Sequence, residues 1–185
     1  IEAMTIDTTD DAAITVNLGA NQEATTAVAG DLSSLTITDA ATVTLKASGG
    51  GFGNLLSSDM ETVTLDDEET TGLTIESSDY TSLEAVVAGS ESLATLAVDA
   101  SGIESDVEVD SLADAVALTS LSLTASGLNS TLDLGQVGEG DATANLAILD
   151  TISVTASNGS VIDFHTAADS EEGDINTQGD LVSLT

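Results

Sequence analysis

The sequence of 185 residues has no cysteine and no proline, and aromatic residues make up only 2% of it. The absence of cysteine excludes a disulfide framework and fits secreted proteins that do without one. With so few aromatic rings available, any core has to be filled by small aliphatic and β-branched side chains. Such side chains suit a narrow core that has no room for rings.

Basic residues are almost absent as well. Lys46 is the only one against 33 acidic residues, which gives a formal net charge of −32. This charge would repel a phosphate backbone, so we expect no binding to nucleic acid. An anionic lipid surface is equally unfavourable unless multivalent cations bridge it. No apolar run reaches the length of a membrane-spanning helix, so we expect no membrane insertion.

Apolar residues nevertheless account for 41% of the chain, and they recur in alternating runs. High charge with few aromatics is often a sign of disorder, but this alternation is the pattern of strands that bury one face. The stretch 118–129 shows the unit best, because Leu121 and Leu123 alternate with Ser and Thr before Gly127. Gly127 can take a positive φ without steric cost, so we expect the chain to bend there.

Related units recur about 13 to 32 residues apart, near the range of solenoid repeats. They predict an all-β fold, a β-solenoid of short irregular coils, with a β-sandwich as the alternative. A stack of coils of roughly 20 residues, each adding about 4.8 Å, would be a rod about 40 Å long. We expect one elongated domain over 1–185, with an irregular part in 1–30. The apolar anchors of the units are Leu35, Val63, Leu83, Leu96, Leu121, Ile152 and Leu184.

The alternation also predicts how neighbouring segments are arranged. The segments 4–6 and 13–18 have the pattern of two strands joined by an acidic turn. The segment 131–135 is expected to pair with the unit before it, at 118–129. The segment 181–184 has the pattern of a further copy of the unit that is cut short.

Acidic residues gather in short stretches. Glu104, Asp106, Glu108 and Asp110 alternate along an expected strand, which would put all of them on one face. Like charges so close are destabilising unless a cation lies between them. Calcium takes oxygen ligands from carboxylates, carbonyls and water, so we expect Ca²⁺ at these stretches, with a solvated acidic surface as the alternative. The candidate metal ligands are Asp66, Asp67, Glu68, Glu69, Glu104, Asp106, Glu108, Asp110, Asp169, Glu171, Glu172 and Asp174.

Catalytic constellations are weak in this sequence. His165 is the only imidazole, and its neighbours Asp163 and Ser160 lie too close in one strand to converge into a Ser–His–Asp triad. A polysaccharide-acting β-helix enzyme would use paired carboxylates, but so few aromatic and basic residues make a poor sugar cleft. We therefore expect no enzymatic activity. Threonine-rich faces would suit ice if they formed flat, regular ranks, and the irregular spacing of the units argues against such ranks.

Units such as M-E-T-V-T-L at 60–65 and L-S-L-T-A-S-G at 121–127 resemble the β-solenoid portions of bacterial surface-layer proteins and of large RTX-type adhesins secreted by type I systems. Those proteins share the abundance of Thr, Ala, Ser, Val and Asp. Their tandem calcium nonapeptide, G-G-x-G-x-D, is not present here, since the glycine run at 49–53 lacks the aspartate at the right place. Its calcium ligands are therefore not carried over to this chain.

The resemblance implies an extracellular protein of the bacterial cell surface. We expect a structural component of an S-layer, filament or biofilm matrix that self-assembles into a homo-oligomer, with Ca²⁺ bridging acidic loops. Cell-surface polysaccharide is a further candidate partner, and a stalk segment of a calcium-dependent adhesin is the alternative function. Because the sequence begins at Ile1 and shows no signal peptide, we expect a fragment or a processed product.

Overall fold

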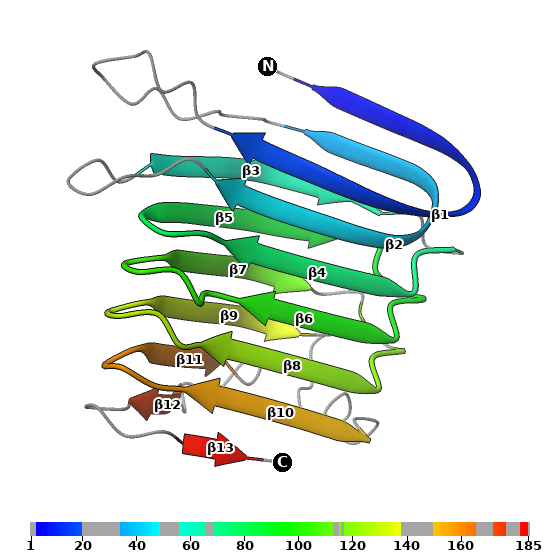
Figure 1. Cartoon of the computed structure of the whole chain (residues 1–185). Coiled ribbons are helices and arrows are strands. Elements are labelled where there is room, and N and C mark those ends of the chain that lie inside the picture. Colours follow the sequence, from blue (N-terminus) through cyan, green and yellow to red (C-terminus); the bar gives the residue numbers. More distant parts are fainter. Residues whose placement is uncertain are drawn as a thin grey trace.

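The computed structural model describes residues 3–19, 34–48, 56–65, 69–112, 115, 117–137, 150–165, 172–176 and 182–184. These residues form strands, turns and bends, and no helix occurs among them. The strands belong to one 13-stranded sheet that is wound into stacked coils (Figure 1). The predicted all-β solenoid is confirmed, and the alternative of a β-sandwich is wrong.

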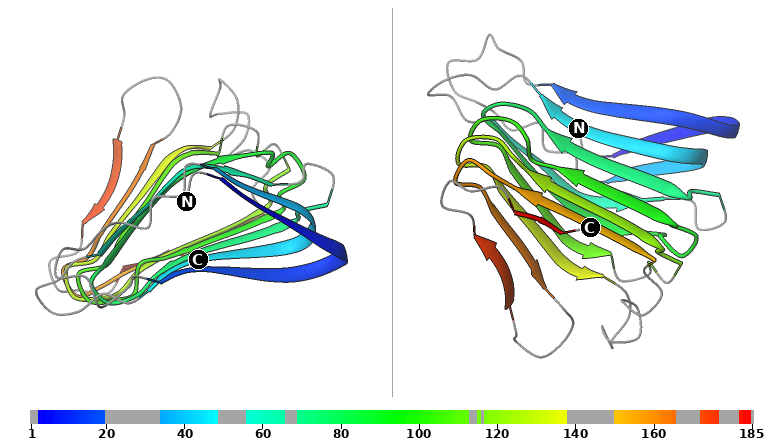
Figure 2. Two further views of the ribbon diagram at one scale, coloured as in Figure 1. Left: turned by 90° about the horizontal axis from the view of Figure 1, so that it is seen from above. Right: turned by 60° about the horizontal axis from the view of Figure 1, so that its bottom comes forward.

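The coils have two long walls that lie on either side of the core and meet at a tight corner (Figure 2). Wall A consists of β1 (Met4–Gly19), β2 (Leu35–Ser48), β4 (Gly72–Ser77), β6 (Thr95–Asp99), β8 (Ser120–Ala125) and β10 (Thr151–Ala156). Wall B consists of β3 (Leu56–Thr64), β5 (Thr81–Ala88), β7 (Asp106–Leu112), β9 (Thr131–Val137) and β11 (Val161–His165). The chain ends with β12 (Glu172–Asn176) and β13 (Val182–Leu184).

Each wall is a parallel sheet in which a strand pairs with the equivalent strand of the next coil. In wall B, β9 pairs with β7 and β11, so the prediction that it pairs with the preceding unit, β8, is wrong. The corner after β8 turns the chain onto wall B. β9 therefore cannot form backbone hydrogen bonds with β8, which lies in wall A. Hydrogen bonds between adjacent coils join residues 23 to 35 positions apart, so a coil is longer than the expected 20 residues.

The first two strands bend and supply a short third side. The beginning of β2 pairs with β1 and with the end of β3, while its second half joins wall A. The bend of β2 contains Asp39 at a φ of 58°, a conformation that aspartate tolerates better than most residues. Thr8 holds the bend because its hydroxyl donates to the carbonyl of Asp39 at 2.7 Å. The two strands expected over 4–18 are thus one bent strand, β1.

The core consists of aliphatic columns that run through the stack. Val43, Leu73, Leu96 and Leu121 lie in register on successive strands of wall A, and all of them are buried. The strict alternation of buried and partly exposed residues along β8 places every second side chain in this core. Each fully buried Leu or Ile contributes about 1.5–3 kcal/mol relative to exposure, so the columns supply the main stabilisation of the coils.

The predicted anchors lie in different columns of this core. Leu35 and Val63 pair on the third side, whereas Leu83 belongs to wall B and Leu96 to wall A. They were predicted to be equivalent because the alternation of apolar and polar residues indicates which side of a strand is buried. It does not indicate which wall the strand joins. Ile152 is 37% exposed, because β13 covers only the second half of β10.

The corner between the walls repeats the same chemistry from coil to coil. Each corner has a positive φ at one shared position, which turns the chain sharply, and the last corner also has one at Asn158 (58°). The residues at the shared position are Tyr80 (57°), Glu104 (49°), Asn129 (55°) and Gly159 (77°). The residue that follows each of them carries a buried hydroxyl. These hydroxyl residues are Thr81, Ser105, Ser130 and Ser160.

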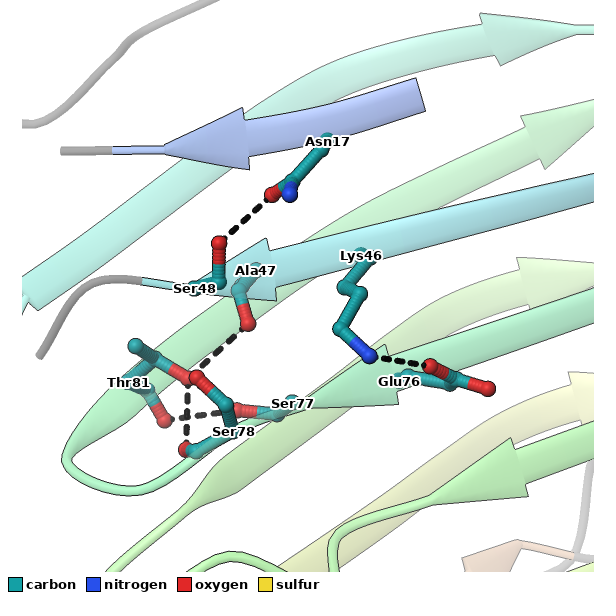
Figure 3. Close-up of polar contacts among 8 residues, drawn as sticks. All are labelled: Asn17, Lys46, Ala47, Ser48, Glu76, Ser77, Ser78 and Thr81. Atoms are coloured by element: carbon teal, nitrogen blue, oxygen red, sulfur yellow. Dashed lines mark hydrogen bonds and ion pairs between the residues drawn. The ribbon is translucent and has the colours of Figure 1, made fainter. Parts of the chain in front are cut away.

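The buried hydroxyls tie the corner to the strand above and to the turn itself. The hydroxyl of Thr81 lies 2.6 Å from that of Ser77 and donates to the carbonyl of Ser78 at 2.7 Å (Figure 3). The hydroxyl of Ser160 accepts from the backbone N–H of Ser157 at 3.0 Å and donates to the carbonyl oxygen of Ala125 in the coil above. At Thr81 and Ser160 the polar groups of the corner are therefore buried together with their partners.

Glycine is required at this corner because adjacent coils approach closely. A Cβ added to Gly127 would lie 1.8 Å from the carbonyl oxygen of Gly102, which is backbone and cannot move aside. A Cβ on Gly102 would lie 2.4 Å from the carbonyl carbon of Ser78. The positive φ of this turn belongs to Asn129. The expected reason for Gly127, a positive φ of its own, is therefore wrong.

The far end of the stack is closed by strands that run in the opposite direction. β13 is antiparallel to β10, and β12 is antiparallel to β11. The expectation that 181–184 repeats the unit is wrong, because a repeated unit would run parallel to β10. Reversed strands cover part of the edges of the last coil, which would otherwise offer free backbone groups for pairing.

Candidate functional site

Wall B presents an acidic residue at the same position of successive strands. Glu84, Glu108, Asp133 and Asp163 are in register, and each directly follows a residue that is buried in the core. The register extends to Asp59 in β3 and to Asp174 in β12. We call this set the acidic column, and it consists of Asp59, Glu84, Glu108, Asp133, Asp163 and Asp174.

The acidic column concentrates like charge along the stack. Neighbouring strands lie about 4.8 Å apart, and two like charges at that distance repel by roughly 1 kcal/mol in water and by more where they are partly buried. Glu84 and Glu108 are exposed, whereas Asp133 and Asp163 are half-buried. The Oδ1 atom of Asp163 is covered and has no hydrogen-bond partner among the described residues. This column is the place on wall B where a cation would relieve the most repulsion.

The column is a line of carboxylates and not a closed cage. Within the described ranges, no three His, Asp or Glu side chains come together closely enough to hold a metal ion. A cation at the column would therefore contact carboxylates of successive coils and complete its shell with water, as hard cations with oxygen ligands do. Calcium at the predicted residues stays a prediction.

The predicted acidic stretch 104–110 is divided by the structure. Asp106 and Glu108 lie on the outward side of β7, whereas Glu104 lies in the corner before the strand. Asp106 accepts a hydrogen bond from the hydroxyl of Thr131 on the next coil. An extra residue in β7 shifts the register between β5 and β7 at Asp110. Of this stretch, Glu108 alone belongs to the acidic column.

The other predicted stretches lie mostly outside the described residues. Asp66, Asp67 and Glu68 are outside, and Glu69 is exposed at the turn before β4. Asp169 and Glu171 are also outside. In β12, Asp174 is in register with Asp163 of the acidic column, and Glu172 is in register with His165.

Sequence reasoning missed most of the acidic column, although a signal for it exists. Each member from Glu84 to Asp163 lies between two apolar residues, in the triplets L-E-A, V-E-V, L-D-L and I-D-F. This triplet recurs once in each of the wall B strands β5, β7, β9 and β11. The predicted sites are carboxylates that are close together in the sequence, whereas the column is built from single residues far apart in the sequence.

The outward side of wall A has a different chemistry. Its central rank carries Thr44, Thr74, Ala97, Ser122 and Ser153, and the rank beside it carries charged residues. We call this second rank the lysine column, and it consists of Asn17, Lys46, Glu76, Asp99, Thr124 and Thr155. Wall A is therefore covered mainly by hydroxyl and methyl groups.

Lys46 pairs with a carboxylate of the next coil. Its Nζ lies 2.8 Å from Oε2 of Glu76, and both side chains are more than a third exposed (Figure 3). An exposed pair of this kind contributes at most about 1 kcal/mol. Above it, the hydroxyl of Ser48 donates to Oδ1 of Asn17 at 2.7 Å. These contacts bind one coil to the next along the lysine column.

The ranks on wall A are straight. The pairings of β4, β6, β8 and β10 proceed without a register shift. The expectation that irregular spacing of the units prevents regular ranks is therefore wrong. Differences in the length of the chain between strands leave the register of this wall unchanged.

The residues considered for a catalytic triad do not converge. Ser160 is buried at the corner, and its hydroxyl donates to the carbonyl of Ala125. Asp163 lies in the acidic column on the outer side of β11. Because Ser160 and Asp163 are on opposite sides of wall B, they cannot act on one substrate atom together.

Comparison with protein-family models, with curated proteins and with solved structures gave no match. None of the described segments is a helix long and apolar enough to cross a membrane.

Proposed function

We propose that this chain is a structural module of an extracellular bacterial surface layer, filament or matrix, and that divalent cations control its assembly. The observation that carries the proposal is the acidic column of wall B in a chain whose only basic residue is Lys46. The chain has no second lysine and no arginine to place at this column, and Lys46 is bonded to Glu76 on wall A. Cations from an extracellular medium would neutralise the column, and their binding would couple to folding and association.

Calcium suits this role better than a transition metal. The chain offers carboxylates and no thiolate, and it has only one imidazole. Hard cations prefer such oxygen ligands, and extracellular calcium modules bind with dissociation constants of about 10⁻⁴–10⁻³ M. A calcium ion between two copies would join their acidic columns where repulsion otherwise keeps them apart.

Removal of calcium tests the proposal. Thermal melting and sedimentation velocity of the purified chain are compared with CaCl₂ and with chelator at constant ionic strength, and MgCl₂ serves as a control ion. We expect calcium to raise the melting temperature and to produce assemblies that chelator disperses. An unchanged melting temperature and unchanged sedimentation would show that calcium does not control folding or assembly.

Two double variants test whether the calcium response depends on the acidic column. Asp133→Asn with Asp163→Asn removes two charges from the column, and Glu91→Gln with Asp150→Asn removes two exposed charges outside the walls. We expect the first pair to weaken the calcium response and the second pair to leave it unchanged. A chain that gains stability from calcium but stays monomeric would favour the stalk of an adhesin over a lattice.

A further inference from the structure

Wall A is a side of the coil on which little negative charge is exposed. In a chain of net charge −32, the charged residues at the outward positions of the straight part of wall A, from the second half of β1 and β2 to β10, are Lys46, Glu76 and Asp99, whereas Asp7 and Asp39 lie on the bent third side. Lys46 is the only basic residue of the whole sequence. All three belong to the lysine column and lie on consecutive strands. Two copies that meet through wall A therefore bring together less like charge than copies that meet through wall B.

The acidic columns hardly oppose such an approach. Sheets packed face to face lie about 10 Å apart, and a similar distance separates the two walls of one coil across its core. The acidic column of one copy would thus lie roughly 20 Å from wall A of the other, more than twice the screening length of about 8 Å at physiological ionic strength. The acidic columns therefore add little to the repulsion between copies that meet through wall A.

We infer that two copies of this chain associate face to face through wall A, in opposite orientations, with Lys46 of each copy against Asp99 of the other. Lys46 and Asp99 lie on the strands on either side of Glu76. A two-fold axis that runs parallel to the strands and passes over β4 therefore superposes β2 of one copy on β6 of the other. Thr74 on β4 then faces Thr74 of the second copy.

The side chains of wall A fit this arrangement. Its central rank holds only Thr, Ser and Ala, which allow two sheets to approach without large gaps. The Oδ1 atom of Asp99 is covered and has no hydrogen-bond partner in the described parts of the chain. Lys46 is already bonded to Glu76. An ammonium group from a second copy would compensate the carboxylate of Asp99.

The expected contact is weak. With strands about 4.8 Å apart and a rise of about 3.3 Å per residue, the face covers roughly 500 Å² in each copy, less than the 800 Å² typical of a stable complex. The charged cluster also keeps more carboxylates than ammonium groups. Such a contact becomes strong only in an array of many copies. The inference thus deepens the proposed function by naming one surface and one symmetry of self-assembly.

The first test uses two variants that change the net charge equally. Sedimentation equilibrium is measured in chelator at physiological ionic strength, so that metal bridges are absent. We expect Lys46→Gln to weaken self-association by about tenfold or more, because each dimer loses two ion pairs. Ser82→Glu, on wall B, also makes the chain one charge more negative. It should change the association constant by less than about threefold. The charge exchange Lys46→Asp with Asp99→Lys should restore association.

The second test determines the symmetry. The chain has no cysteine, so a single introduced cysteine reports only contacts between copies. We expect a short bismaleimide to link Thr74→Cys into a covalent dimer. Thr155→Cys lies three strands farther along the same wall. Its mate in the second copy would be roughly 29 Å away, and no link should form. Melting curves confirm that both variants are folded.

Several results would overturn the inference. These are equal weakening by Lys46→Gln and Ser82→Glu, efficient linkage of Thr155→Cys, and a chain that stays monomeric at all concentrations in chelator. A monomer that shapes growing ice crystals would instead assign the straight ranks of wall A to ordered water. Calcium-dependent assembly that is unaffected by Lys46→Gln would rule out the wall A contact but would still support the proposed function.

Discussion

At the scale of single residues, the corner glycines show how little room the stack leaves. Gly127 has no unusual φ, yet a Cβ there would overlap the backbone carbonyl of Gly102. Gly159 is the opposite case, because its φ is 77° but the space beside it is open, the nearest atom to an added Cβ being 3.7 Å away. The same residue type therefore meets two different requirements at one corner of the fold.

This contrast predicts the stability of two alanine variants. Gly127→Ala should destabilise the chain by about 3 kcal/mol or more, because backbone of the neighbouring coil has to move. Gly159→Ala should cost about 1–2 kcal/mol, which is the strain of a left-handed residue. Urea unfolding followed by circular dichroism measures both. Equal losses for the two variants would mean that close packing at the corner is not what requires Gly127.

At the scale of the structural element, the corner is a repeated turn with one buried hydroxyl per coil. Ser160 is fully bonded, since it donates to the carbonyl of Ala125 and accepts from the N–H of Ser157. Ser105 occupies the equivalent position two coils earlier, and its hydroxyl has no partner among the residues described. Equivalent corners therefore differ in how well they satisfy the same group.

The difference between these corners can be measured. Ser160→Ala should destabilise the chain by about 1–3 kcal/mol, because it leaves a buried N–H and a buried carbonyl without a partner. Ser105→Ala should be neutral or slightly stabilising, because it removes an unpaired buried hydroxyl. Both substitutions remove the same atom at the same depth. A loss of stability in Ser105→Ala as large as in Ser160→Ala would show that Ser105 has a partner after all.

The elements themselves could largely be predicted from the sequence, whereas their partners could not. Alternation around Leu121 and Leu123 correctly indicates a strand with one buried face. It does not reveal that β9 turns onto the other wall, because that depends on the corner at 126–130, where Asn129 takes a positive φ. Local sequence patterns indicate which residues are buried, whereas pairing between strands 23 or more residues apart is set by the length and shape of each coil.

The candidate site shows the same limit. The triplets L-E-A, V-E-V, L-D-L and I-D-F are visible in the sequence, but their alignment into one column follows from the register of β5, β7, β9 and β11. Dense stretches such as 104–110 were predicted to bind metal because their charged residues are close together in the sequence. In the fold, Glu104 and Glu108 are separated by the start of the strand.

At the scale of the whole molecule, the net charge of −32 means that electrostatic repulsion opposes folding. Stacking brings carboxylates of successive coils within about 5 Å, closer than the screening length at physiological salt. An unfolded chain can keep these groups farther apart. The stability of the fold should therefore rise with ionic strength even in the absence of divalent cations.

One substitution in the acidic column tests this dependence. Asp163→Asn removes a charge that lies in register with Asp133 and Asp174 on its two sides. At low salt it should stabilise the chain by about 1 kcal/mol, and at 1 M salt, where the screening length is about 3 Å, the gain should largely vanish. Asp150→Asn, which removes an exposed charge before β10, is the control. Urea midpoints across a NaCl series measure both, and equal gains would place the repulsion elsewhere.

The solitary lysine also determines how the protein responds to trypsin. Trypsin cleaves after lysine and arginine, so the sequence offers it one site, and that site lies within β2, where Lys46 is bonded to Glu76. The folded chain should resist digestion, since cleavage requires an extended segment that can leave the sheet. After denaturation it yields only two long peptides, which are poorly suited to mass spectrometry. Surveys that rely on tryptic peptides would therefore undercount these 185 residues even where they are abundant.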